Sequence, residues 1–501
     1  MIEIGIGLRR SGPDRGSERT ANGTVHLALI VAMAVALLAG TALAQQPDRS
    51  NPPAIGPAPA LRLPSVEKGT LSNGVPVWVI EQHRVPLAQV NVIMRGGSSL
   101  DRTGRYGMAS LVAAMLDEGA GARSALDLAD AVDFLGADLS TSSTFDYSAV
   151  RLSAPIKNLP AALGLLADVV LRPAFPANEL ERLKKERLSA LVQARDNPAQ
   201  IIGYAFPRVV FGPTYRYGTP ASGLGPVIEA VTADEARAFY KEHYTSGNAT
   251  IVVTGDVTLA GVRAELDKAF TGWPSSGARG TTAALPVAPQ LTKREIVLVD
   301  KPGAAQSQIR IGWVGVPRST ADYATLQVLN SLLGGSFGSR LNQNLREEHG
   351  YTYGAASMFD MRSSAGPFLA TAGVQTDKTA PALHEFFVEL EGIQKPIPAA
   401  EVEKAKNYVA LGFPAEFETT RALAQKLEEL IVYNLPDDTY QSFFESVQKV
   451  TVAEVQKAAA RYIQADKMAV VVIGDLKAIE PGIKALNLGP IRVVPIEEFF
   501  K

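Results

Sequence analysis

Two periodicities of apolar residues divide the chain into a series of expected strands and helices. Strict alternation or short buried runs predict strands, and apolar residues three or four positions apart predict helices. In the first part of the chain the expected strands cover residues 75–80, 88–94, 138–143, 147–153 and 249–254. The expected helices cover residues 106–116, 126–135, 159–171, 178–195 and 199–211.

The same order of elements begins again after residue 290. Strands are expected at 296–299, 308–314 and 468–473, and helices at 321–333 and 452–462. Thr232 and Glu235 form a predicted capping box, in which a threonine caps a helix and a glutamate three residues later reaches back. Thr451 and Glu454 repeat it 219 positions later, and Gly255-Asp256 recurs as Gly474-Asp475 with the same separation. Several matches in one register indicate a duplication of a whole domain.

The duplication predicts the fold class and the domain boundaries. We expect an α+β protein of two duplicated two-layer domains, each a mostly antiparallel sheet covered on one face by helices, with a cleft between them. The domains are placed at residues 67–270 and 291–495. Residues 271–290 are rich in Gly, Ser, Thr and Pro and predict a linker. The alternative is a pair of ordinary α+β domains without a site.

Composition narrows the functional classes. The 501 residues are 46% hydrophobic, with a formal net charge of -2, so the sequence gives no argument for a nucleic-acid partner. The chain contains no cysteine, which excludes disulfides, thiolate nucleophiles and cysteine-ligated metals.

The N-terminal region predicts export. Residues 27–40 are an uninterrupted apolar run that is short for a membrane-spanning helix of about 20 residues. Ala42-Leu43-Ala44 follows with the small-x-small pattern of a cleavage site. We therefore expect a signal peptide at 1–44, a Pro/Ala-rich tether at 45–66 and a periplasmic protein. The alternative is an uncleaved membrane anchor, which also places the body outside the cytoplasm.

Candidate chemistry lies between Ser339 and Gly354. Arg346 is expected near the end of a short helix that Gly350 terminates, and Tyr353 at the start of a strand. A guanidinium and a phenol hydroxyl are two donors that suit a peptide carbonyl or a developing oxyanion. The alternative is that Arg346 pairs with a nearby glutamate and Tyr353 packs in a core. A phosphate-binding loop at Gly334–Gly338 is rejected because no Gly-Lys-Ser/Thr ending follows.

An Arg followed seven positions later by a Tyr, after a Gly-rich turn and a Ser-Arg-Leu helix, resembles the insulinase/pitrilysin-like zinc peptidases, the group that includes mitochondrial processing peptidase. The resemblance extends from Leu71 to Asp475. It implies that Arg346 and Tyr353 bind substrate near the scissile bond. Gly335, Ser336 and Phe337 are then expected to contact an extended substrate.

The metal ligands of that family are missing. Its inverted motif H-x-x-E-H lies in a frame that here reads Gly107 to Leu116, and the positions of the two histidines and the general-base glutamate carry Ser110, Ala113 and Ala114. The family's third ligand is a glutamate on a later helix. Its expected position here is near Ala190 or Leu191, and neither side chain can bind a metal. We therefore expect no metal or cofactor in this chain.

The resemblance then implies the subunit type that lacks zinc and bears the Arg/Tyr pair. Its partner is expected to be a paralogous, zinc-bearing subunit, and its substrate a peptide or a small unfolded protein. Two alternatives stay open. One is a catalytically inactive scaffold of an envelope complex, and the other is an autonomous zinc peptidase.

Overall fold

The computed structural model describes residues 63–274 and 285–501, which form two six-stranded sheets with helices, as the sequence predicts. The predicted signal peptide at 1–44, most of the tether at 45–66 and the middle of the linker at 271–290 lie outside the described residues. No helix of the described part of the chain is long and apolar enough to span a membrane.

The first sheet has the strand order β1-β2-β6-β3-β5-β4. Only β2 and β6 pair in parallel, so the sheet is mostly antiparallel. The central strand β6 is buried along its whole length, which explains its continuous run of β-branched residues. The strands of this sheet are β1 (Glu67–Thr70), β2 (Pro76–Glu81), β3 (Leu87–Arg95), β4 (Asp138–Ser143), β5 (Tyr147–Pro155) and β6 (Ala249–Gly255).

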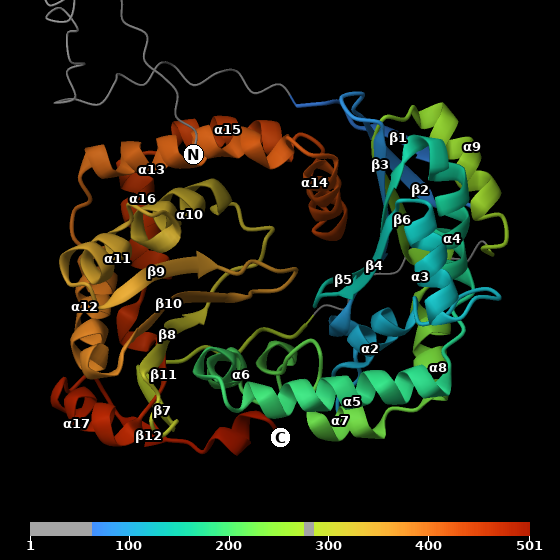
Figure 1. Ribbon diagram of the computed structural model, residues 1–501. Helices are drawn as coiled ribbons and strands as arrows, with labels where there is room; N and C mark the ends of the chain where they lie inside the picture. The colour runs from blue at the N-terminus through green and yellow to red at the C-terminus, as the bar shows by residue number, and fades with distance from the viewer. Residues whose placement is uncertain (1–62, 275–284) are drawn as a thin grey trace, which may run out of the picture. The chain divides into compact units, whose positions relative to one another are not determined.

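Helices of the first half of the chain cover one face of this sheet. Figure 1 shows α4 and α9 standing against its strands. The helices of this half are α2 (Met108–Met115), α3 (Ala125–Phe134), α4 (Leu159–Leu171), α5 (Ala177–Ala194), α6 (Pro198–Phe211), α7 (Gly225–Ala230), α8 (Ala233–His243) and α9 (Leu259–Ala269).

The second sheet has the order β12-β7-β11-β8-β10-β9 and repeats the arrangement. Its strands β7, β8 and β11 are the counterparts of β2, β3 and β6. The strands are β7 (Glu295–Asp300), β8 (Gln306–Val314), β9 (Thr352–Phe359), β10 (Pro367–Gln375), β11 (Ala469–Gly474) and β12 (Ile491–Val493). The helices are α10 (Tyr323–Asn330), α11 (Arg340–Asn342), α12 (Thr379–Gly392), α13 (Ala399–Gly412), α14 (Thr420–Val432), α15 (Thr439–Lys449), α16 (Val452–Tyr462) and α17 (Leu476–Ala485).

The structure confirms the repeated capping boxes. At α8 the Thr232 side chain accepts from the backbone N–H of Glu235, and the Glu235 carboxylate accepts from the backbone N–H of Thr232. Thr451 and Glu454 make the same pair of bonds at α16. The helices α8 and α16, like the strand pairs β2/β7 and β3/β8, begin 219 positions apart. The two halves therefore share one architecture as well as a few matching residues.

The other face of each sheet is packed against a helix from the opposite half of the chain. Apolar residues of α14, including Leu427 and Ile431, join one core with Ile93 and Val252 of the first sheet. In return α6 packs on β8 and β11 of the second sheet, where Phe206 lies in a common core with Val471. Because each half supplies a helix to the other, neither sheet completes its core from its own half.

A buried carboxylate fixes α14 against the first sheet. The Glu428 side chain is 4% exposed, and it accepts hydrogen bonds from Arg151 Nε at 2.9 Å and Nη2 at 2.8 Å. Asn91 Nδ2 at 2.6 Å and the Tyr147 hydroxyl at 3.2 Å complete its shell. A buried charge with this many partners is fully satisfied, and removing the carboxylate leaves the arginine charge uncompensated.

We predict that Glu428→Gln lowers the free energy of unfolding by about 3–5 kcal/mol, because it leaves Arg151 partly buried without its counter-ion. Urea-induced unfolding measures the change. The matched control is Asp437→Asn, which breaks an exposed ion pair with Lys68 that also joins the two halves. This control is expected to cost at most about 1 kcal/mol. Equal losses for the two variants would contradict the importance of the buried pair.

Candidate functional site

Arg346 lies in η6 (Gln343–Glu348), a π-helical segment that continues α11. Its guanidinium carbon lies 4.3 Å from the centre of the Phe337 ring, which holds the side chain by a cation–π contact. Nη1 lies 3.2 Å from Oε1 of Glu347, so the alternative of a neighbouring glutamate partner is also realised. The Arg346 side chain is one-third exposed. An ion pair at such an exposed place contributes little stability, and it leaves other N–H donors of Arg346 free for a ligand.

Tyr353 is displayed on β9, the outermost strand of the second sheet. The residue is 92% exposed, so the alternative of a core tyrosine is wrong. A β-bulge lies at this position, since the pairing of β9 with β10 shifts between Ala372 and Val374. The Thr352 hydroxyl donates to Gly373 O at 2.7 Å and accepts from Gly354 N–H at 3.1 Å, which fixes the bulge. Bulges re-aim side chains, and here the bulge directs the phenol away from the core.

Two hydrogen bonds and the turn between them tie the helical segment to the strand. The N–H of Tyr351 donates to Leu345 O at 2.9 Å as the chain reverses after Arg346. Gly350 adopts a positive φ of 65° at this reversal, as expected for a helix terminator. The Asn342 side chain accepts from the N–H of Ala355 at 3.0 Å. The residues that carry Arg346 and Tyr353 are therefore held together from both sides.

The Gly-rich turn is required by packing as well as available for binding. Gly334 lies in η5 (Ser331–Gly335), and a Cβ built there would be 2.4 Å from the backbone nitrogen of Ser357 on β9. Of the predicted substrate contacts, Gly335 and Phe337 are exposed and Ser336 is half-buried. The Ser336 hydroxyl donates to Ser331 O at 2.9 Å, so part of its capacity serves the turn.

The helix in the place of the family's metal motif is α2, and a cation lies against it. Arg187 of α5 donates from Nη2 to Ser110 O at 2.8 Å and to Ser110 Oγ at 3.2 Å. Burial lowers the pKa of Arg187 to about 10, and its hydrogen-bond partners among the described residues are the carbonyl oxygens of Ser222 and Ser110 and the Ser110 hydroxyl. The sequence pattern did not identify Arg187. The one feature that could have pointed to it is its position three residues before Ala190, on the helix expected to bear the third ligand.

These residues do not fit a zinc ion. Ser110, Ala113 and Ala114 offer one hydroxyl where a catalytic site needs three strong ligands and an open position. A guanidinium beside them repels a divalent cation. Among the described residues no group of three or more His, Asp and Glu side chains is arranged to hold a metal.

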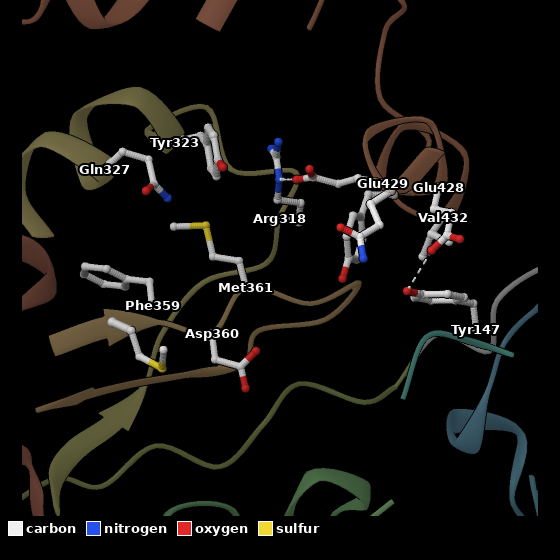
Figure 2. Close-up of a pocket in the computed structure, with 13 residues that line it drawn as sticks. Tyr147, Arg318, Tyr323, Gln327, Phe359, Asp360, Met361, Glu428, Glu429 and Val432 are labelled. Carbon is white, nitrogen blue, oxygen red and sulfur yellow. Dashed lines mark hydrogen bonds and ion pairs between the residues drawn. The ribbon is translucent and has the colours of Figure 1, made fainter. Parts of the chain in front are cut away.

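A cavity lies where Tyr147 of the first half meets side chains of the second half. It has a volume of about 490 Å³, and Figure 2 shows Tyr147 of β5 beside Glu428 of α14, with Phe359 of β9 and Tyr323 of α10 on the far side. Three carboxylates line it, and each already has a cationic partner: Glu428 with Arg151, Glu429 with Arg318 and Asp360 with Arg362. Of these pairs only Glu428 with Arg151 joins the two halves, and the sequence pattern, which predicts a cleft between the halves, does not predict that pair.

The fold and the site together define a duplicated peptidase-type chain that carries Arg346 and Tyr353 on adjoining elements and has Ser110, Ala113 and Ala114 in place of the family's metal motif. The chain belongs to the insulinase family of peptidases, M16. Residues 77–206 match the model of the insulinase domain of this family, and residues 230–409 match the model described as its inactive domain.

Known proteins agree with this assignment. A protein from Streptomyces coelicolor, described as an uncharacterized zinc protease, is 24% identical over 420 residues, covering 82% of this chain and 90% of its own length. The crystal structure of a peptidase M16 inactive domain from Pseudomonas fluorescens superposes with a TM-score of 0.75 and 26% identity, covering 82% of this chain and 98% of that one. A chain of Complex III2 from Candida albicans shares the fold, with a TM-score of 0.69, 15% identity and coverage of 84% and 99%.

We predict that restoring the motif gives only weak zinc binding while Arg187 remains. The test introduces Ser110→His, Ala113→Glu, Ala114→His and Ala190→Glu, with and without Arg187→Gln. Because the guanidinium is partly buried, its repulsion is weakly screened, and removing it is expected to raise zinc affinity at least about tenfold. Competition with a zinc indicator dye measures the affinity. Equal affinities with and without Arg187 would contradict this role.

Proposed function

We propose that this chain is the non-zinc subunit of an exported insulinase-like metalloendopeptidase. The observation that carries the proposal is the exposed Tyr353 on β9, a strand that Asn342 ties to the helical segment bearing the one-third-exposed Arg346. A phenol exposed this far contributes nothing to the core. Its placement is explained if it meets a ligand or a partner.

The chemistry follows from the donors. Arg346 offers several N–H groups in a planar fork, and Tyr353 offers one hydroxyl. Both suit the oxygen of a peptide carbonyl, whose negative charge grows during hydrolysis. Metal chemistry would come from a zinc-bearing paralogous subunit, because the residues around Ser110 in this chain do not fit the ion. Gly335, Ser336 and Phe337 would contact the extended peptide or small unfolded protein beside the pair.

Export completes the proposal. A signal peptide at residues 1–44 would deliver the chain to the periplasm, where no cysteine is at risk of oxidation. Fractionation of cells that express the full chain, with sequencing of the mature N-terminus, tests this. Recovery of the intact chain in the cytoplasm would count against it.

We predict that Tyr353→Phe lowers kcat of the reconstituted heteromer about 100-fold or more, because one donor to the developing oxyanion is lost. Peptide hydrolysis by the co-expressed subunits measures kcat, and co-purification measures assembly, which is expected to be unchanged. The matched control is Tyr351→Phe. Tyr351 lies only two residues before Tyr353, but its ring stacks on the ring of His349. Its hydroxyl is therefore expected to be dispensable.

The alternative function is an inactive scaffold of the same fold in an envelope complex. The fold shared with a chain of Complex III2 supports it. The same experiment separates the two proposals. A heteromer whose turnover is indifferent to both Tyr353→Phe and Arg346→Gln would favour the scaffold.

A further inference from the structure

Arg187 of α5 differs from the deeply buried arginines of this chain, which have carboxylate partners. The Arg216 side chain is 3% exposed and pairs with Asp101. The Arg318 side chain is 6% exposed and pairs with Glu429. The acceptors of Arg187 among the described residues are all uncharged, and burial lowers its pKa with no nearby carboxylate to raise it. A partly buried cation without a counter-ion is costly, and a ligand that supplies the negative charge removes that cost.

The guanidinium of Arg187 keeps donors that are free for a ligand. Nη2 donates to Ser110 O at 2.8 Å and to Ser110 Oγ at 3.2 Å, and Nη1 donates to Ser222 O at 3.4 Å. The Nε–H and the second N–H of Nη1 therefore make no hydrogen bond among the described residues. The Ser110 hydroxyl accepts from Arg187, which leaves its own hydrogen free to donate. A charged donor and a neutral donor thus lie next to each other.

The residues around this guanidinium are short enough to leave it open. Ser110 and Ala114 lie one turn apart on α2, which packs against α5, and both are half-buried. Ala190 follows Arg187 by three residues on the same side of α5 and is exposed. Arg187 itself is half-buried, and its Nε is not sealed from solvent. Short neighbours therefore leave room for a ligand to approach the guanidinium.

The ligand that suits these donors carries a negative charge and accepts hydrogen bonds. A carboxylate does both, and a peptide brings one at its C-terminus or on an Asp or Glu side chain. Arg187 stays protonated at neutral pH, because its pKa of about 10 lies well above it. A hydrogen bond between an ionised donor and an ionised acceptor is roughly twice as strong as one between neutral groups.

We propose that Arg187 and Ser110 bind a carboxylate of the peptide ligand. The place is the one where the family carries its metal motif, so the first half offers a guanidinium there instead of a metal ion. This rests on the proposed peptide-binding function and deepens it, because it gives the first half its own contact with the peptide. It also names an anionic group as a feature of the ligand.

The test compares unlabelled peptides of Ala, Ser and Leu that are acetylated at the N-terminus, by isothermal titration calorimetry with the full chain. One form has a free C-terminal carboxylate, one has a C-terminal amide, and a third set has the amide with one Asp moved along the peptide. The free acid is expected to bind about tenfold more tightly than the neutral amide. An Asp peptide that matches the free acid assigns the carboxylate to a side chain, and one that does not assigns it to the C-terminus.

Variants of the two residues identify the site. Arg187→Met is expected to abolish the preference for the carboxylate, and Ser110→Ala to weaken it severalfold. Arg187→Lys keeps the charge but loses the planar fork, so part of the preference is expected to stay. Thermal unfolding without peptide separates binding from a structural role. Arg187→Met is expected to leave the melting temperature unchanged or higher, because an uncompensated charge is removed.

The matched control is Arg182→Met, the same change on the same helix. Arg182 already pairs with Glu118, Glu179 and Glu186, so its loss is expected to leave the preference unchanged. If Arg182→Met abolishes the preference as Arg187→Met does, a general effect of charge explains it and the site is overturned. A lower melting temperature for Arg187→Met with the preference intact identifies a structural clamp and also overturns the site.

Arg346→Gln separates this site from the proposed function, since it is expected to weaken all the peptides alike. If the wild type shows no preference but Arg346→Gln weakens binding, the carboxylate site is overturned and the proposed function stands. If Arg187→Met abolishes the preference and Arg346→Gln has no effect, the carboxylate site stands and the role of Arg346 falls. Absence of binding by every peptide overturns the site, and the turnover of the Tyr353→Phe heteromer then decides the proposed function.

Discussion

Reciprocal packing of one helix from each half is the constraint on which the structure depends. Each sheet buries one face under its own helices, and its other face is apolar enough to require cover as well. The cover comes from α14 for the first sheet and from α6 for the second. Only residues 413–419 separate α13 from α14 in the chain, so the position of α14 also limits where α13 can lie. The buried Glu428 and its partners give this packing a single register, since apolar contacts alone permit sliding.

Duplication followed by divergence explains the two inter-helix spaces. In the first half, a serine and two alanines stand where the family carries its metal motif, and Arg187 of a neighbouring helix donates hydrogen bonds to the serine. In the second half, the equivalent space between η5 and α13 is a pocket of about 300 Å³ whose lining includes Leu332, Ala405 and Tyr408. One half has thus acquired a fixed internal cation, while the other retains a cavity next to exposed polar groups. The contrast supports a division of roles within the chain.

The sequence predicts much of the fold, because the fold rests on local patterns. The alternating runs at β2 and β3, the capping boxes at Thr232 and Thr451 and the repeat distance all survive in the structure. The exchange of α6 and α14 was not predictable, because an amphipathic helix does not specify which sheet it covers. At the site, the placement of Arg346 and Tyr353 follows from the helix stop at Gly350. The bulge at Tyr353 and the approach of Arg187 to Ser110 depend on contacts between distant segments, which periodicity does not report.

The exchanged helices also bear on how such a chain arose. A single-repeat ancestor would expose one apolar sheet face unless a second copy covered it. Two copies that each lent a helix to the other would form a domain-swapped, two-fold symmetric dimer, with both faces closed at once. Joining the two genes end to end would convert that dimer into one polypeptide. Each repeat would then be able to lose functional residues that the other repeat retained. Under this history, the loss of metal ligands in one repeat required no change in how the pair holds together.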